Sequence, residues 1–189
     1  MSRYDAIVMG CSAGGLNALQ RMLPALDDQL RAPVVVCCHT GSSNVSLLVE
    51  LLGRVSALPV VEARERASVD PGTVHVAPAG YHLLVEDDFR FSLSVDAKVS
   101  FARPSIDVLF ETAAAAWGDR LVAVLMTGAN ADGADGLAAI RRAGGYAIVQ
   151  DPRDAEADAM PLAGLRVAGA DACLPLDAIP ALLNDLCLP

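Results

Sequence analysis

The chain has 189 residues, of which 53% are apolar and only 4% aromatic, and its formal net charge is −9. This length suits one domain with a substantial core of Val, Leu, Ile and Ala, so we expect residues 1–189 to form a single domain. The acidic charge, and the lack of any basic run of five or more residues, argue against nucleic acid or an anionic membrane surface as a partner.

Five cysteines without a C-x-x-C pair argue against a disulfide framework or a standard zinc site. The N-terminal residues lead straight into a strand pattern instead of a signal peptide, and no apolar run reaches membrane-spanning length. We therefore expect a reduced, cytoplasmic protein without membrane insertion.

Short β-branched runs alternate with amphipathic helical patterns, which is typical of a mainly parallel sheet flanked by helices. In the first part of the chain the pattern predicts strands at residues 5–10, 33–38, 59–62 and 73–77, and helices at 15–24 and 44–54. Ser43 or Asn44 is the expected N-cap of the second helix. Apolar and polar residues then alternate around Asp87 and Asp88, so residues 83–94 are predicted to form an antiparallel hairpin.

The second part of the chain continues the same alternation. Ser105 is expected to cap a helix that reaches about residue 117, and residues 121–126 form a continuously apolar run, as in a buried parallel strand. A helix at 135–143, a strand at 146–150 and two helices around a short strand at 172–174 follow. The predicted fold is α/β: a three-layer, doubly wound, mostly parallel sheet with an antiparallel hairpin insertion.

The pattern G-x-S-x-G at residues 10–14 falls where the first strand should turn into the first helix. Small residues on both sides allow a sharp turn that projects Ser12 at the end of the sheet, as in a nucleophile elbow. Two alternatives stay open for this segment. It can be the glycine-rich first turn of a nucleotide-binding fold, or Ser12 can simply cap the helix.

Two further reactive side chains are expected at the same edge of the sheet. His39 directly follows the second strand, and Asp132 lies in the turn after the apolar strand at 121–126. Loops that leave the carboxyl ends of parallel strands share one edge, and binding sites form where the strand order reverses. Our preferred interpretation is therefore a catalytic triad, in which the serine is the nucleophile, the histidine is its base and the aspartate orients the imidazole.

Each member has a structural alternative. His39 can bond a backbone group at its strand end, and Asp132 can belong to an Asx turn or an N-cap. Asp135 competes for the same roles, and we expect it to cap its helix while Asp132 meets the histidine. His75 lies inside a strand pattern, where a core or sheet-surface role is favoured, whereas His82 remains a candidate wall residue of the site.

Several segments in order along the chain resemble the catalytic domain of CheB-type chemotaxis methylesterases. They are Gly10 to Gly15, Val36 to His39, Val76 to His82, Arg103 to Phe110, Thr127 to Gly136 and Ala159 to Pro161. The resemblance implies catalytic roles for Ser12, His39 and Asp132 in hydrolysing glutamate methyl esters on chemoreceptor signalling helices, with release of methanol. It also implies deamidation of receptor glutamines, and no metal or organic cofactor.

The chain also departs from the family pattern. It begins directly at the catalytic domain without the usual receiver domain, so we expect control, where it exists, to come from a separate regulatory protein. Thr40 follows the histidine where Met is expected, and Ala129 and Asn130 replace a Met-Gly pair. Leu162 stands where a basic residue usually follows the Met-Pro pair.

The substrate contacts follow from the same loops. We expect oxyanion N–H groups near Ala13 or in the turn at Gly128 and Ala129. The remaining predicted contacts come from the loops around the sheet edge and form the walls of an open groove: Thr40, His82, Arg103 and Met160.

Two other functions compete with hydrolysis for this sequence. A dinucleotide-binding domain would need a middle glycine where Ser12 stands and an acidic ribose ligand where His39 ends the second strand. A non-catalytic adaptor of the same fold, derived from the esterase and binding receptors or kinases, stays open. Such an adaptor would not need to keep all three triad members, although this chain has them all.

Overall fold

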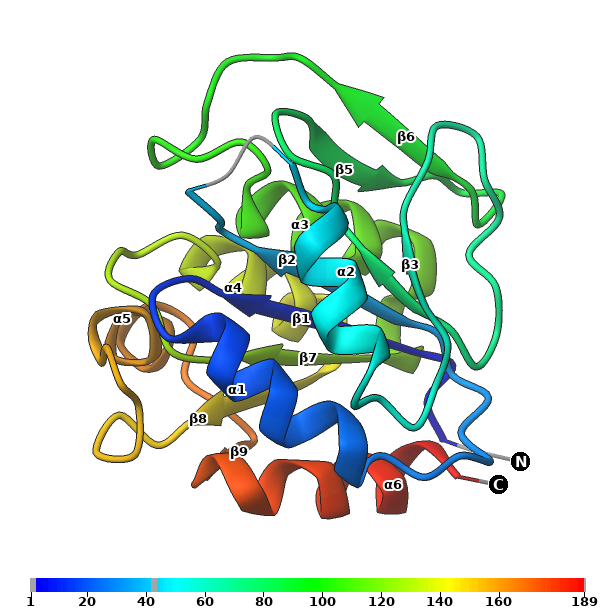
Figure 1. Ribbon diagram of the computed structural model, residues 1–189. Helices are drawn as coiled ribbons and strands as arrows, with labels where there is room; N and C mark the ends of the chain where they lie inside the picture. The colour runs from blue at the N-terminus through cyan, green and yellow to red at the C-terminus, as the bar shows by residue number, and fades with distance from the viewer. Residues whose placement is uncertain (1–2, 42–43, 189) are drawn as a thin grey trace.

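The structure is a computed structural model that describes residues 3–41 and 44–188. Its main sheet has seven parallel strands in the order β3-β4-β2-β1-β7-β8-β9 (Figure 1). The bounds are β1 (Ala6–Cys11), β2 (Val34–Cys38), β3 (Val60–Glu62), β4 (Val74–Val76), β7 (Leu121–Leu125), β8 (Tyr146–Gln150) and β9 (Ala172–Leu174). The predicted parallel sheet is confirmed.

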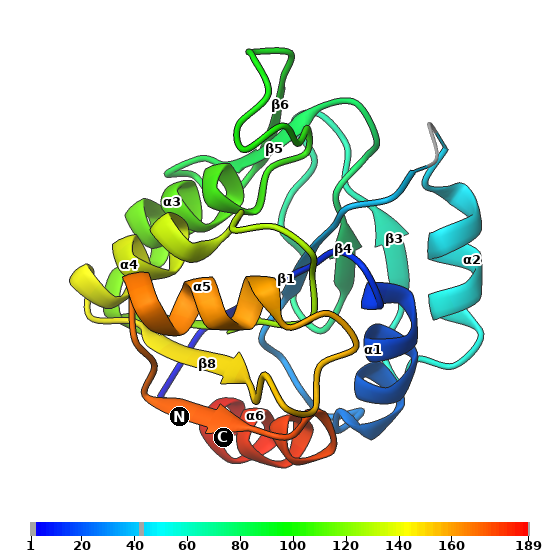
Figure 2. The ribbon, with the colours of Figure 1, turned by 90° about the vertical axis from the view of Figure 1, so that its left-hand side faces the viewer.

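Helices cover both faces of this sheet and make the molecule three layers thick (Figure 2). The first face carries α1 (Gly15–Met22), α2 (Ser46–Gly53) and α6 (Ile179–Cys187), and the second carries α3 (Ile106–Trp117), α4 (Ala134–Arg142) and α5 (Ala159–Val167). Each face has its own apolar cluster, because alternate side chains of every buried strand point to opposite sides. The predicted three-layer α/β architecture is confirmed.

The antiparallel hairpin is a separate two-stranded sheet of β5 (His82–Val85) and β6 (Phe91–Ser94). It packs against α3, on the second face of the molecule. Its position confirms the predicted insertion. The loop that leaves β6 then runs over the edge of the main sheet before entering α3 (Figure 1).

Two helix boundaries differ from the prediction. Helix α1 ends at Met22, because the next residues, with Pro24, form a 3₁₀ turn, η1 (Leu23–Ala25). Helix α2 begins at Ser46, and its N-cap position is Val45. Asn44 still holds the helix start, since its Oδ1 accepts the Ser46 N–H at 2.8 Å. Ser43 lies outside the described residues. Two further 3₁₀ turns are η2 (Gly118–Arg120) and η3 (Leu176–Ala178).

The order of the strands places the site. The chain progresses from β1 to β2 in one direction and later returns to add β7 on the other side of β1. This is the point at which strand order reverses, where α/β sheets bind ligands beyond their carboxyl ends. The loops after β1, β2 and β7 all meet there.

Candidate active site

Ser12 occupies the sharp turn between β1 and α1. Its backbone N–H donates to the Thr127 carbonyl at 2.9 Å, which ties the turn to the neighbouring strand end. Gly14 has φ = 78°, in the left-handed region that favours glycine. A Cβ on Gly10 would lie 2.4 Å from Cγ2 of Ile106, so the strand end needs glycine for close packing. These constraints leave the Ser12 side chain partly exposed at the sheet edge, at the predicted strand-to-helix elbow.

His39 lies beside Ser12 because β1 and β2 are neighbouring strands. The register pairs Cys11 with Cys38, and the His39 N–H donates to the Cys11 carbonyl at 3.0 Å. The residues that follow the two strands therefore leave the sheet side by side. The His39 side chain is 14% exposed, enough to face a substrate while resting on the protein.

Asp132 reaches the histidine from the loop after β7. Its Oδ2 lies 2.7 Å from His39 Nε2 and also accepts the Ile106 N–H at 2.7 Å. Its Oδ1 accepts the Ser105 hydroxyl at 2.8 Å and the Asp107 N–H at 3.1 Å. The carboxylate is completely buried and satisfied on both oxygens.

The surroundings of Asp132 determine its charge. Burial raises the pKa of this carboxyl, but the hydrogen bonds from His39, from two backbone N–H groups and from Ser105 outweigh it and lower the pKa below its ordinary value. Asp132 is therefore an anion that only accepts hydrogen bonds, and His39 must donate its Nε2–H to it. The free electron pair of the neutral imidazole is then on Nδ1.

The relation between Ser12 and His39 is looser than a direct hydrogen bond in this structure. Among the described residues, no hydrogen bond joins Ser12 Oγ to a ring nitrogen of His39. The two residues nevertheless line the same two pockets. Nucleophile and base can be apart in an unliganded site and approach only when a substrate is bound.

A second serine and a second histidine belong to the same hydrogen-bond network. Besides Asp132, Ser105 contacts His82, whose Nδ1 accepts the Ser105 N–H at 3.2 Å. His82 Nε2 in turn donates to the Ala97 carbonyl at 2.9 Å. Ser105 is completely buried and His82 is 2% exposed, so neither can meet a protein substrate without unfolding. The prediction that His82 lines the substrate groove is wrong, because both of its nitrogens are used inside the protein.

Asp107 is the residue that sequence reasoning missed. Its Oδ1 accepts the N–H groups of Gly133 at 2.9 Å and Gly136 at 2.7 Å, at the start of α4. Burial is the main cause that raises the pKa of Asp107 to about 6, with the negative charge of Asp132 adding to it. Asp135 is exposed and makes no capping bond, so its predicted capping role is wrong.

The predicted substrate contacts divide into two groups. Ser12, His39 and Thr40 line two pockets of about 500 Å³ each, one between α1 and α2 and one beneath the loop that enters α3. Ala13 and Arg103 line the second of these pockets. These residues lie around the carboxyl edge of the sheet, and their roles in binding substrate stay predictions.

Gly128 and Met160 serve the fold instead. The Gly128 N–H donates to the Ala157 carbonyl at 3.0 Å, so it is not available for an oxyanion. Met160 is completely buried, and its side chain packs on Gly128, where a Cβ would lie 2.5 Å from Met160 Cε. The tentative substrate roles of both residues are therefore corrected. Ala129, one of the family departures, is exposed beside them, and Leu162 is exposed on α5.

The described residues offer neither a metal centre nor a membrane-spanning helix. Within residues 3–41 and 44–188, no group of three or more His, Cys, Asp or Glu side chains is arranged to hold a metal ion. No helix in this part of the chain is long and apolar enough to cross a membrane.

Together, the fold and the site define a class: a doubly wound α/β domain that presents a serine, a histidine and a buried aspartate at the carboxyl edge of a parallel sheet. The comparisons with known proteins are more specific. The family described as CheB methylesterase matches residues 7–183. A crystal structure of the Thermotoga maritima CheB methylesterase catalytic domain superimposes with a TM-score of 0.93 at 31% identity, covering 97% of this chain and 98% of that one.

Two relatives show the extent of the match. A Leptospira interrogans protein, provisionally named a protein-glutamate methylesterase/protein-glutamine glutaminase, is 44% identical over 183 residues, which cover 97% of this chain and 95% of that protein. A Symbiobacterium thermophilum protein with the same name is 38% identical over 173 residues, or 92% of this chain, and the match spans 48% of its length.

This chain belongs to the CheB methylesterase family, a family of carboxyl-ester hydrolases. The resemblance stated from the sequence motifs is thereby confirmed, and the dinucleotide-binding alternative loses its basis.

Proposed function

We propose that this protein hydrolyses γ-methyl esters of glutamate on chemoreceptor signalling helices and releases methanol. The same site deamidates receptor glutamines, as the paired names of its relatives suggest for them. The observation that supports this best is the 2.7 Å contact between His39 Nε2 and the buried Asp132, directly beside the partly exposed Ser12 elbow. We place the reaction in the cytoplasm, where receptor signalling helices are accessible.

In the proposed mechanism Ser12 is the nucleophile and His39 the general base. As Ser12 Oγ attacks the ester carbonyl carbon, its proton passes to Nδ1 of His39, and Asp132 stabilises the imidazolium. The tetrahedral intermediate then collapses, and methoxide leaves with the proton from His39 as methanol. Water, deprotonated by His39, hydrolyses the resulting acyl-enzyme and leaves a glutamate carboxylate.

The oxyanion of the intermediate needs N–H donors that the fold does not already use. The Ala13 and Ala129 N–H groups have no hydrogen-bond partner among the described residues, in contrast to those of Ser12 and Gly128. The peptide that bears the Ala13 N–H is held in place, because its carbonyl, that of Ser12, accepts the Gly15 N–H at 2.7 Å. We therefore assign Ala13 and Ala129 as the oxyanion donors, preorganised for the charge that develops.

Methanol release from a methylated receptor signalling fragment tests this function. Wild-type protein should release methanol, and Ser12→Ala should lower the rate at least about a thousandfold, because removal of one triad member costs several orders of magnitude. Ser68→Ala, in the loop between β3 and β4, is the matched serine control and should retain the wild-type rate. Binding of the fragment without any methanol release by the wild type would indicate the adaptor alternative instead.

A further inference from the structure

We propose that the loop of residues 95–102, which follows the hairpin and connects β6 to α3, is the docking surface for the acidic helix that carries the methyl ester. We call it the hairpin loop. Phe101 supplies its apolar contact and Lys98 its charged contact. This inference rests on the proposed function, because it names how that substrate is held.

Phe101 is displayed at the tip of a tight turn. The backbone groups of Val99 and Ala102 bond each other at 3.1 and 2.8 Å and leave Ser100 and Phe101 as the two turn residues. Their φ angles are 48° and 63°, in the left-handed region where such turns normally use Asn or Gly. The Phe101 side chain is 97% exposed. This backbone conformation is unfavourable for a large apolar residue, and the exposed ring is fully hydrated as well.

Phe89 is a second phenylalanine with a positive φ angle, and it differs from Phe101 in its contacts. Phe89 also has a positive φ, 58°, at the turn between β5 and β6. Its ring, however, stacks on Trp117 with centroids 5.6 Å apart. Among the described residues, Phe101 has no such ring contact. The strain at Phe89 is offset within the chain, whereas a contact for Phe101 has to come from another molecule.

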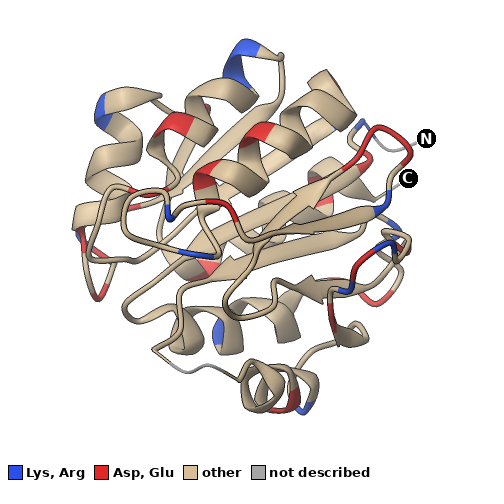
Figure 3. Cartoon of the chain, turned by 90° about the horizontal axis from the view of Figure 1, so that it is seen from above, with Lys and Arg blue, Asp and Glu red and all other residues tan. Residues whose placement is uncertain are grey.

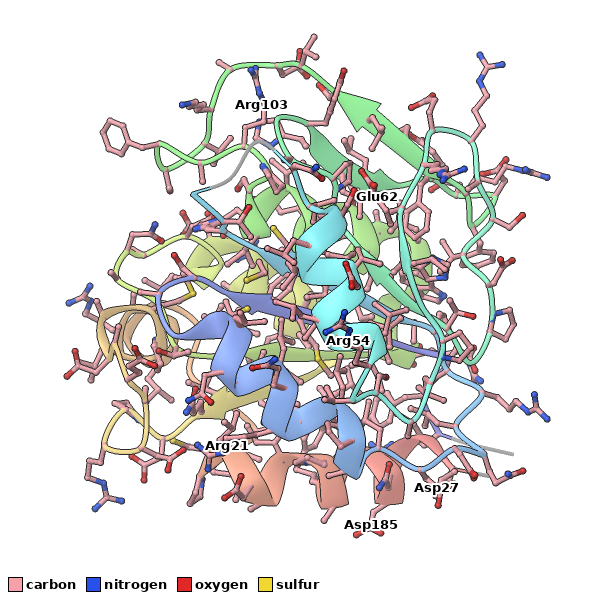
Figure 4. The ribbon with its side chains drawn as sticks, viewed as in Figure 1. Arg21, Asp27, Arg54, Glu62, Arg103 and Asp185 are labelled. Carbon is pink, nitrogen blue, oxygen red and sulfur yellow. The ribbon has the colours of Figure 1, made fainter. Side chains whose placement is uncertain are left out.

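The hairpin loop faces the proposed catalytic residues. One pocket of about 500 Å³ is lined by Ser12 and His39 on one side and by Lys98, Phe101 and Arg103 on the other. Figure 4 places the Arg103 side chain inside the loop, and its Nη1 donates to the carbonyls of residues 95 and 96 at 2.7 and 3.0 Å. Arg103 thus braces the loop in its position over the pocket. A small ester at Ser12 would not extend to Phe101, but a helix about 10 Å wide would.

The charges of this pocket suit an acidic helix. Lys98 is the single lysine of the sequence, is exposed, and forms no ion pair within the described residues. Among the described residues, the buried Arg103 Nε has no hydrogen-bond partner. Among the described residues that line this pocket there is no Asp or Glu, although Asp96 is exposed earlier in the loop. In a chain of net charge −9 whose basic residues are dispersed (Figure 3), this positive wall complements a helix that bears several glutamates.

The test compares a large and a small substrate. For the methylated receptor fragment, Phe101→Ala and Lys98→Glu should each lower kcat/KM by about five- to twentyfold, because a few anchor residues that become buried on binding carry most of the energy of an interface and complementary charge speeds the encounter. For p-nitrophenyl acetate, both variants should remain within about twofold of wild type. Phe89→Ala and Arg31→Glu, which change an aromatic and a basic residue away from this pocket, are the matched controls.

Binding to the inactive protein distinguishes a failure of the docking assignment from a failure of the proposed function. In the Ser12→Ala background, Phe101→Ala should weaken binding of the methylated fragment by a similar factor in fluorescence anisotropy. Wild-type affinity and wild-type kcat/KM in both loop variants, or an equal loss on both substrates, would overturn the docking assignment. Failure of the proposed function would look different: the wild type would release no methanol from the fragment.

Discussion

The Asp132 side chain connects the proposed catalytic histidine to the fold. The carboxylate that receives the His39 Nε2–H also accepts the Ile106 and Asp107 N–H groups and the Ser105 hydroxyl. One residue therefore sets the tautomer of the imidazole and satisfies the first turn of α3. The imidazole keeps its orientation because the partner that holds it cannot move without exposing a helix end.

Asp132→Asn tests this double role. An amide nitrogen would oppose an N–H donor in this site, so we expect methanol release to fall by about 10⁴-fold through the wrong tautomer. The depressed pKa of Asp132 means that its stabilisation is present above the unfolded pKa, about 3.9, and is lost as the pH falls through the folded pKa. Urea unfolding between pH 7 and pH 3 should show a steeper acid loss in wild type than in the variant. Equal slopes would contradict the assigned ionisation.

The residues that could be predicted from the sequence are those that a single strand positions. Ser12 and His39 each follow a recognisable apolar strand, so the parallel arrangement alone brings them together. The burial of His82 and the use of the Gly128 N–H depend on which distant loops pack over them, and no local pattern contains that information. The pattern at Ser105 did predict a cap, which the structure confirms through the bond from the Val108 N–H to its hydroxyl.

Helices α3 and α4 hold each other's first turns. Asp132, just before α4, binds the N-terminal N–H groups of α3, while Asp107, in the first turn of α3, binds those of Gly133 and Gly136 at the start of α4. A carboxylate at a helix N-terminus satisfies unpaired donors and complements the dipole. Sequence spacing pointed to Asp135 instead, because a cap is usually sought within its own helix. The exchange exists only when the two helices pack side by side.

Two substitutions of Asp107 separate its bonds from its charge. Both N–H bonds go to Oδ1, which asparagine retains, so Asp107→Asn should change the free energy of unfolding by less than about 1 kcal/mol at pH 4, where the folded protein holds Asp107 protonated. Asp107→Ala leaves two buried donors unpaired and should cost about 2–3 kcal/mol. Urea denaturation measures both. Similar losses in the two variants would contradict the capping role.

The raised pKa of Asp107 adds a pH signature. A carboxyl whose folded pKa is about 6 contributes stability below its unfolded pKa of about 4, and this contribution is lost as the pH rises through 6. The charged neighbours that act on it are Asp132 and Asp135, both of which raise its pKa. The difference in unfolding free energy between wild type and Asp107→Asn should therefore shift in favour of the variant between pH 4 and pH 7. A difference that does not change with pH would refute the assignment.

For the whole molecule, alternation of strands and helices was enough to predict a three-layer parallel sheet and the edge that carries the site. The position of β4 between β3 and β2 could not be predicted, because periodicity identifies strands but not their neighbours. The path of the loop after β6 over the site depends in the same way on long-range packing. It is this path that adds a positive wall to an acidic protein.

Salt should reveal the balance between net and local charge. A molecule of charge −9 repels an acidic receptor fragment, and salt screens that repulsion, so we expect kcat/KM to rise about two- to threefold between 20 and 200 mM NaCl. Lys98→Glu removes the local attraction and should make the rise steeper. Hydrolysis of neutral p-nitrophenyl acetate should not change. A rate that falls steeply with salt would show that local attraction outweighs net charge.

Peptide mapping of a covalent adduct tests the central claim most directly. After incubation with a serine-directed phosphonate and proteolysis, mass spectrometry should locate the label on Ser12, with loss of esterase activity in proportion to labelling. Ser105→Ala should still be labelled at Ser12, because the buried Ser105 only positions Asp132. A label on Ser105, or full labelling and activity in Ser12→Ala, would contradict the assignment of Ser12, His39 and Asp132.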